Sequence, residues 1–306
     1  MHAPKRLPPE LDGRPFTFRD ALTRGVTRER TRSSDLDRPF RGIRAPQAPD
    51  RSFLQSCEAY AAGMADDQYF SHLTAARLLG LPLPWRLQDS SLLHVTSKLP
   101  RRAPRARGVV GHHAEPERVH GATVEGLRIT SAIQTWCDLA TVLSVRELIV
   151  IGDALVRRKQ PLATLAELRQ AVEGWGGRRG ARKLREALEA VRAGVDSPKE
   201  TEVRLIIVGA GLPEPSVNAT IRNARGEFIA LGDLVYLGYR ILVEYDGAHH
   251  FAGDEQFYKD IDRLDAVMEE KWRVVRLNKT HLRRPEVIVA KVRTALLASG
   301  WHPDIR

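Results

Sequence analysis

Three carboxylates lie in one short stretch, GDLVYLGYRILVEYDGAHH at residues 232–250, which has the pattern of a β-hairpin. A two-residue loop at 238–239 would set Asp233 directly opposite Glu244. Facing Cβ atoms in such a pair are about 4.5 to 5.5 Å apart, so two ionised carboxylates repel there. Asp246 follows two residues after Glu244 and should lie on the same face. Because hard oxygen ligands suit Mg²⁺ or Mn²⁺, the pattern predicts that Asp233 and Glu244 hold such an ion.

The helices and strands expected around this hairpin indicate a compact mixed α/β domain over residues 196–306. Asp196 or Ser197 is the expected N-cap of its first helix, with Pro198 at the first helical position. The expected elements are helix 198–210, strands 217–223, 227–236 and 240–246, helix 255–271, strand 273–278 and helix 285–299. One side of the second helix should pack on the sheet through Phe257, Ile261, Leu264 and Met268.

The ordered motifs of this region resemble the very-short-patch-repair (Vsr-like) endonuclease group of the PD-(D/E)XK superfamily. The matching pieces lie within residues 197–301 and are SPKE, Asp233, VEYDGAHH, DIDR and WRVVRLN. The resemblance implies a restriction-endonuclease-like αβββαβα fold and hydrolysis of DNA phosphodiesters with Mg²⁺ or Mn²⁺. The catalytic residues that it implies are Glu200, Asp233, Glu244, Asp246 and His250, with Asp233 and Glu244 as the metal ligands.

The implied roles leave several alternatives open. Glu200 would act through a metal-bound water, although a surface ion pair or a favourable contact with the helix dipole would also explain it. His250 would orient or deprotonate the attacking water. The superfamily's lysine is absent because Asp246 takes its place, so the general base stays unassigned. Arg263 and Arg276 either clamp a phosphate or pair with the acids.

The charge of the chain favours a polyanionic partner. The net charge is +10, and residues 1–195 hold 32 Lys and Arg against 21 Asp and Glu, whereas residues 196–306 hold 16 against 17. A basic stretch, KLPRRAPRARG, lies between two expected strands of the first part. It is either a solvated loop or a set of phosphate contacts made by Arg101, Arg102, Arg105 and Arg107.

The region before residue 196 predicts two further domains. Residues 1–50 contain two short helical patterns, FTFRDALTRG and TRERTRSSDL, and a basic arm, RPFRGIRAP, which predict a winged-helix-like DNA-binding unit or a helical cap. Residues 51–195 are expected to form a middle α+β domain that contains the basic loop and a helical linker. With HLTAARLLGLPLP and RITSAIQTWCDLA, these stretches resemble AbiEi-type antitoxin or regulator proteins, which bind operator DNA. Gln134 stands where many of those proteins have Arg.

The histidines and cysteines of the middle region predict no metal centre. His112 and His113 are adjacent on an expected strand and should face opposite ways, and neither His94 nor His120 has a ligand spacing to them. The two cysteines, Cys57 and Cys137, are in no paired spacing, which favours a reducing compartment. No apolar run approaches the roughly 20 residues of a membrane span, so we expect a cytoplasmic protein without a membrane partner.

Two functions therefore remain open from the sequence. The first is a metal-dependent DNA endonuclease with an N-terminal DNA-binding or regulatory region. The second is an AbiEi-type antitoxin or transcriptional regulator that binds DNA and carries an inactive nuclease-like domain. A defence nuclease acting on RNA is a more remote alternative, because aromatic residues for base stacking make up only 6% of the chain. DNA is the expected partner, and a homodimer is left open.

Overall fold

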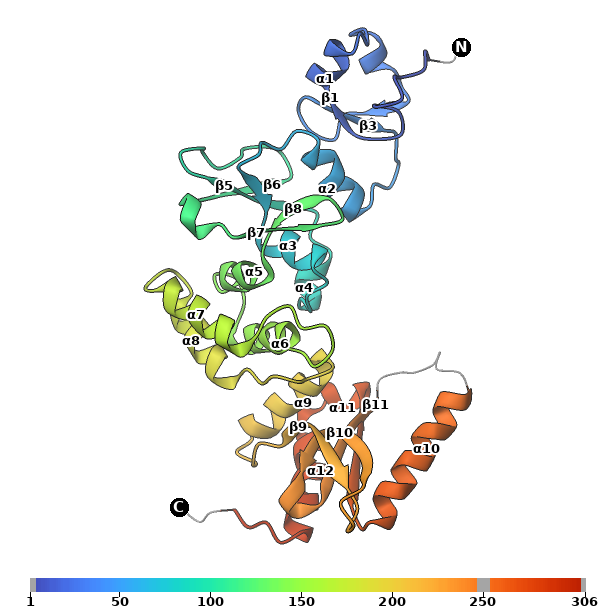
Figure 1. Ribbon diagram of the computed structural model, residues 1–306, viewed down its shortest axis with the longest axis vertical. Coiled ribbons are helices and arrows are strands. Elements are labelled where there is room, and N and C mark those ends of the chain that lie inside the picture. The colour runs from blue at the N-terminus through green and yellow to red at the C-terminus, as the bar shows by residue number, and fades with distance from the viewer. Residues whose placement is uncertain (1–3, 247–253, 304–306) are drawn as a thin grey trace. The chain divides into compact units, whose positions relative to one another are not determined.

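The chain forms two compact units in the computed structural model, which describes residues 4–246 and 254–303, with the backbone alone for 254–260. The N-terminal unit is Met1–Leu139 and the C-terminal unit is Ala140–Arg306. Both combine helices with a sheet, so the predicted mixed α/β class is confirmed (Figure 1). None of the described helices has the length and apolarity that a membrane crossing requires.

The first fifty residues surround a small antiparallel sheet in the order β1-β3-β2. Its strands are β1 (Phe16–Thr17), β2 (Leu36–Asp37) and β3 (Ile43–Pro46). Helix α1 (Phe18–Thr23) starts after Thr17, whose hydroxyl accepts a 2.9 Å hydrogen bond from the Asp20 N–H. The second predicted helix forms only a 3-10 turn, η1 (Arg30–Arg32). The basic arm becomes the β2–β3 hairpin.

The rest of the N-terminal unit is a five-stranded sheet in the order β6-β5-β4-β8-β7. Its strands are β4 (Gln68–Phe70), β5 (Leu93–Lys98), β6 (Val109–Ala114), β7 (Gly121–Val124) and β8 (Leu127–Thr130). The helices are α2 (Phe53–Ala61), α3 (His72–Leu78), α4 (Trp85–Gln88), η2 (Pro116–Arg118) and α5 (Ala132–Leu139). Strands β5 and β6 run parallel, with Thr96 paired to His112. Phe70, Val95 and Ile129 are fully buried at the centre of the sheet.

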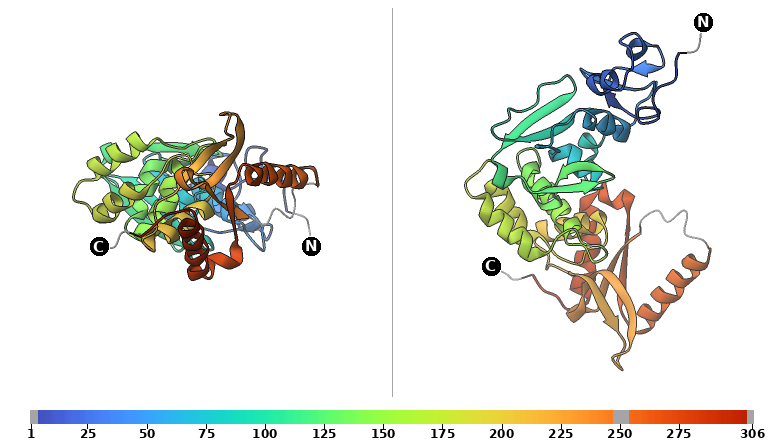
Figure 2. Two further views of the ribbon diagram at one scale, coloured as in Figure 1. Left: turned by 90° about the horizontal axis from the view of Figure 1, so that it is seen from below. Right: turned by 45° about the horizontal axis from the view of Figure 1, so that its top comes forward.

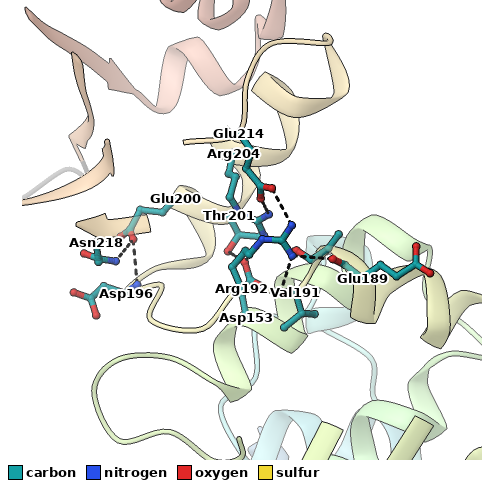
Figure 3. A network of polar contacts seen from close by, with 11 residues as sticks. Asp153, Glu189, Val191, Arg192, Asp196, Glu200, Thr201, Arg204, Glu214 and Asn218 are labelled. Carbon is teal, nitrogen blue, oxygen red and sulfur yellow. Dashed lines mark hydrogen bonds and ion pairs between the residues drawn. The ribbon is translucent and has the colours of Figure 1, made fainter. Parts of the chain in front are cut away.

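The C-terminal unit begins with the helices α6 (Val145–Leu155), α7 (Leu165–Trp175), α8 (Ala181–Ala190) and α9 (Pro198–Gly209). A buried polar network joins α6 to α9. Arg204 of α9 and Asp153 of α6 form a 2.7 Å ion pair, and each side chain is 1% exposed (Figure 3). Thr201 donates a further 2.8 Å hydrogen bond to Asp153. This contact packs α6 against α9 within the C-terminal unit, which begins at Ala140, whereas the sequence predicted domain boundaries near residues 50 and 195.

A four-stranded sheet in the order β12-β11-β10-β9 completes the C-terminal unit. Its strands are β9 (Ser216–Arg222), β10 (Phe228–Tyr236), β11 (Ile241–Asp246) and β12 (Arg273–Asn278). The other elements are η3 (Leu237–Tyr239), α10 (Asp254–Glu269), α11 (Lys279–Leu282) and α12 (Pro285–Ala298). Leu234 and Val243 pack with α9 and α12, whereas Val235 and Leu242 pack with α10. The sheet therefore lies between α12 and α10 (Figures 1 and 2).

The apolar side of α10 differs in part from the predicted one. Leu264 and Val267 pack against the sheet. Ile261 and Met268 are 40% and 49% exposed, so their predicted packing is wrong. The side chain of Phe257 lies outside the described residues. Among the described side chains of the helix, from residue 261 on, the packed residues Leu264 and Val267 form an i, i+3 pair.

Candidate active site

The two strands that carry the acids pair in the predicted register. Leu234 lies opposite Val243, and Tyr236 lies opposite Ile241. Extending this register by one residue sets Asp233 opposite Glu244. The predicted two-residue loop is wrong, because residues 237–240 separate the strands through η3 and a left-handed residue, Arg240, with φ of 49°.

Hydrogen bonds fix the two facing carboxylates on the α10 side of the sheet. Oδ2 of Asp233 accepts a 2.9 Å hydrogen bond from the backbone N–H of Tyr245. Oε1 of Glu244 accepts a 3.1 Å bond from the guanidinium of Arg263 on α10. Glu244 is only 8% exposed. By strand alternation both acids lie on the face of Leu242, which packs against α10.

Burial and mutual repulsion disfavour full ionisation of this pair. Burial, with a further contribution from the charge of Glu244, raises the pKa of Asp233 to about 7. Burial also raises the pKa of Glu244, although Arg263 acts in the opposite direction. Two carboxylates in this state titrate as a pair and bind protons more readily than separate, solvated ones. A divalent cation at the pair would favour the doubly ionised form.

Glu200, in the first turn of α9, lies close enough to Asp233 to feel its charge. Its Oε2 accepts 3.1 Å hydrogen bonds from the Asp196 N–H and from Nδ2 of Asn218, as Figure 3 shows. Burial, followed by the charge of Asp233, raises the pKa of Glu200. At 5% exposure Glu200 is not a surface acid, so the surface ion-pair interpretation is wrong. Arg204, one helical turn later, binds Asp153 and Glu214 instead.

The outer part of the predicted site consists of paired charges. Nε and Nη2 of Arg276 donate to Oδ2 of the exposed Asp246 at 3.0 and 2.5 Å. Arg263 binds Glu244. Of the two predicted alternatives for Arg263 and Arg276, a phosphate clamp or pairing with the acids, the structure therefore shows the pairing. His250 lies outside the described residues, and the structure therefore does not test its predicted role.

The separation of the acids limits which of them can bind one ion directly. Among the described residues, a set of three His, Cys, Asp or Glu ligand atoms that all lie within 4.8 Å of one another occurs at His72, His94 and His112. Glu200, Asp233 and Glu244 form no such set. The three carboxylates therefore do not all meet closely enough to be direct ligands of one ion in this arrangement.

That histidine set is a candidate metal site in the middle region, where the sequence predicted none. His94 lies on β5 and His112 on the neighbouring β6, and His72 begins α3. His113 is exposed, as its predicted opposite orientation requires. The spacing of adjacent histidines carried no signal for this cluster, because its members come from three separate elements.

The predicted basic loop is held against β6 and presents exposed arginines. Arg101 pairs with Asp67 at 2.6 Å. The exposed members that form no ion pair with a described residue are Arg102, Arg105 and Arg107. A Cβ at Gly111 of β6 would lie 2.1 Å from the carbonyl oxygen of Pro104, so the absence of a side chain there lets the loop approach the strand.

A second basic cluster surrounds the β2–β3 hairpin. Burial, then the charges of Arg38 and Arg32, lower the pKa of Arg44. Arg32 and Arg38 are exposed. Like charges gathered in this way favour a polyanion beside them. The sequence indicated a basic arm here but did not single out these residues.

Comparisons with known proteins give relatives without an assigned activity. No family model matches the chain. Two proteins of Mycobacterium tuberculosis are similar to it, "Uncharacterized protein MT2308" of strain CDC 1551 / Oshkosh and "Uncharacterized protein Rv2248" of strain ATCC 25618 / H37Rv. Each is 25% identical over 272 residues, which cover 89% of this chain and 96% of the relative. The similarity thus extends over both units.

Proposed function

We propose that the chain is a Mg²⁺- or Mn²⁺-dependent DNA endonuclease whose PD-(D/E)XK-like region spans residues 197–301. The observation that carries the proposal is the buried pair of facing carboxylates, Asp233 and Glu244, with the raised pKa of each. The order of elements from α9 to α12 also supports it, because it follows the αβββαβα order with the short α11 in addition.

The residues of this pair fit a hard divalent cation. Asp233 and Glu244 would hold it, since each offers carboxylate oxygens and their repulsion in a buried setting is relieved by positive charge. Such an ion stabilises charge on the phosphate and lowers the pKa of a bound water. Tyr245 and Arg263 fix the two carboxylates by hydrogen bonds and so orient them.

Glu200 is the described acid best suited to handle a proton at this site. Burial and the charge of Asp233 raise its pKa, which brings it closer to neutral pH and makes it a better base. Its Oε2 is held by Asp196 and Asn218, so the side chain is oriented in advance. We assign Glu200 the role of accepting a proton from water, and Asp246 with Arg276 the role of bordering the site.

The test is nicking of supercoiled plasmid by the full chain with Mg²⁺ or Mn²⁺. The wild-type protein should relax the plasmid, and Glu244→Gln should reduce the rate by at least about a hundredfold because it removes a charged ligand. Glu227→Gln is the matched control, since Glu227 is an exposed acid of the β9–β10 turn. Equal nicking by wild type and Glu244→Gln would overturn the proposal.

The second candidate is a DNA-binding regulator of the AbiEi type, in which the nuclease-like region is inactive. The observation that favours it is the like-charge cluster formed by Arg32 of η1 with Arg38 and Arg44 of the β2–β3 hairpin, which resembles the wing of a winged helix. In this case the full chain binds duplex DNA, and wild type and Glu244→Gln bind equally without nicking. Both proposals place DNA contacts in the basic N-terminal unit.

Salt dependence tests these N-terminal contacts. Replacing the exposed Arg38 and Arg41 by Gln should reduce the slope of log affinity against log salt by up to about 2, since each phosphate that is no longer neutralised lowers it by about 0.9. Replacing the exposed Arg225 of the C-terminal unit by Gln is the control for a loss of charge elsewhere. An unchanged slope in the double variant would exclude the hairpin from the DNA interface.

A further inference from the structure

Three imidazoles from separate elements meet on one side of the five-stranded sheet. His94 is on β5, His112 is on the parallel neighbour β6, and His72 is the first residue of α3. One ligand atom of each lies within 4.8 Å of those of the other two. His94 is 9% exposed, and the other two are partly buried.

The spacing of His94 and His112 suits two ligands of one ion. Nδ1 of His94 lies 3.1 Å from Nε2 of His112, and the ring centroids are 5.3 Å apart. Zn–N bonds of about 2.0 to 2.1 Å at tetrahedral angles set two ligand nitrogens about 3.3 Å apart and their ring centroids about 5.2 Å apart. Both observed separations are close to these values. A direct N–H···N hydrogen bond between the rings is the competing explanation.

The backbone at His72 is held in an unusual conformation. Its φ is 48°, in the left-handed region that non-glycine residues rarely adopt. Such strained backbone tends to persist at functional sites, where the surrounding structure maintains it. In this conformation the His72 ring lies beside β5 and β6 and stacks on His112 with centroids 3.7 Å apart.

Polar groups beside His72 resemble the outer support of a metal ligand. Nδ1 of His72 lies 3.0 Å from the hydroxyl of Ser71 and 3.9 Å from Oδ2 of Asp138. Oδ1 of Asp138 in turn accepts a 2.8 Å hydrogen bond from Gln134. Ligating histidines commonly contact a carboxylate through the second ring nitrogen, which fixes the tautomer and the ring orientation.

We propose that His72, His94 and His112 form a binding site for a borderline transition-metal ion, with Zn²⁺ as the expected ion. Three neutral imidazoles suit Zn²⁺ better than Mg²⁺, which prefers oxygen ligands. Three protein ligands leave a fourth position of a tetrahedral ion for water or for the Asp138 carboxylate. In the present stack the nitrogens of the His72 and His112 rings point in similar directions and not at one common position. Metal binding therefore requires the His72 ring to turn out of this stack.

The site is independent of the acidic pair, since all of its residues belong to the N-terminal unit. Gln134 stands beside it, so the position that departs from the AbiEi-type pattern supports the orientation of Asp138 here.

The experiment is metal binding by the full chain, purified without a polyhistidine tag and stripped with EDTA. Titration with Co²⁺ should give one equivalent with the intense visible absorption of a tetrahedral site, and Zn²⁺ should displace it. The Glu244→Gln chain should bind with the same stoichiometry, which separates this site from the acidic pair. Elemental analysis of the Zn²⁺-loaded protein gives the stoichiometry without reference to any activity.

Two adjacent histidines provide the matched variants. His112→Gln should weaken Zn²⁺ binding by at least about tenfold, whereas His113→Gln, at an exposed neighbouring position, should leave it unchanged. Circular dichroism of both variants checks that they fold. His94→Gln is the second variant if His112→Gln does not fold. Failure of wild type to bind Co²⁺ and Zn²⁺, or equal binding by His112→Gln or His94→Gln and by wild type, would overturn the proposal and leave a hydrogen-bonded histidine pair.

Discussion

The carboxylate of Asp233 accepts a 2.9 Å hydrogen bond from the backbone N–H of Tyr245 on the neighbouring strand. Because Tyr245 directly follows Glu244, this bond holds the Asp233 side chain beside that of Glu244. The two charges therefore cannot separate by a simple rotation of Asp233. The ionisation of the pair should control how the protein responds to pH and to divalent cations.

The first prediction concerns stability against pH without divalent cations. The pKa of Asp233 is about 7 in the folded chain against an ordinary value of 3.8, so the folded state binds more protons between these values. The free energy of unfolding should then fall as pH rises from about 4 to 7, by up to about 1.4 kcal/mol per pH unit. Asp233→Asn should reduce this slope. Urea denaturation at several pH values measures it.

The exposed Asp262 provides the control for that experiment. Asp262→Asn should keep the slope of the wild-type protein, because it removes an exposed carboxylate and leaves the buried pair of Asp233 and Glu244 intact. Identical slopes in wild type and Asp233→Asn would show that Asp233 does not bind the extra proton.

The second prediction concerns cation binding at pH 7.5. A cation that binds only the folded state stabilises the protein by about 1.4 kcal/mol when its free concentration is ten times its Kd. Mg²⁺ or Mn²⁺ should therefore raise the Tm of the wild-type protein, with ionic strength held constant, and should not raise that of Glu244→Gln. An equal increase in both proteins would place the bound cation elsewhere. Differential scanning fluorimetry is sufficient for this comparison.

The fold around the acids was partly predictable from the sequence. The alternation of apolar residues specifies the register that pairs Leu234 with Val243, since a one-residue slip would expose every core side chain. The loop was not predictable in the same way, because Arg240 takes a left-handed conformation that no glycine marked. Register thus followed from local pattern, whereas loop length depended on a single unusual residue.

Contacts between distant residues were beyond local patterns. Arg204 and Asp153 are 51 positions apart, and their buried ion pair places residue 195 inside one packed unit. His94 and His112 meet only because β5 and β6 run parallel as neighbours. The sequence specifies each strand through its apolar run, but it does not say which strands are adjacent. The histidine cluster was therefore missed.

The third prediction concerns that buried ion pair. Arg204→Met leaves Asp153 buried without its main cationic partner, so the C-terminal unit should lose about 3 to 5 kcal/mol of stability. The double variant Arg204→Met with Asp153→Leu should recover much of the loss, because it removes both charges. Urea denaturation of the single and double variants checks this. A single variant as stable as wild type would contradict the assigned role.

The fourth prediction concerns the basic loop. Gly111→Ala places a Cβ 2.1 Å from the backbone oxygen of Pro104, so the loop has to move away from β6. If Arg102, Arg105 and Arg107 contact phosphates, the salt slope of DNA binding should fall by up to about 3. Gly174→Ala is the control, because its Cβ meets no atom within 4 Å. An unchanged slope in Gly111→Ala would favour the solvated-loop interpretation.

The single-turnover rate of DNA cleavage, measured as a function of Mn²⁺ concentration, is the direct test of whether Asp233 and Glu244 form a metal-dependent nuclease centre. The rate should saturate with Mn²⁺ in the wild-type protein and in Glu227→Gln. Asp233→Asn should need a higher Mn²⁺ concentration and reach a rate at least about a hundredfold lower. A rate that is independent of Mn²⁺, or one that is the same in Asp233→Asn and wild type, would contradict the assignment of this carboxylate pair as the nuclease centre.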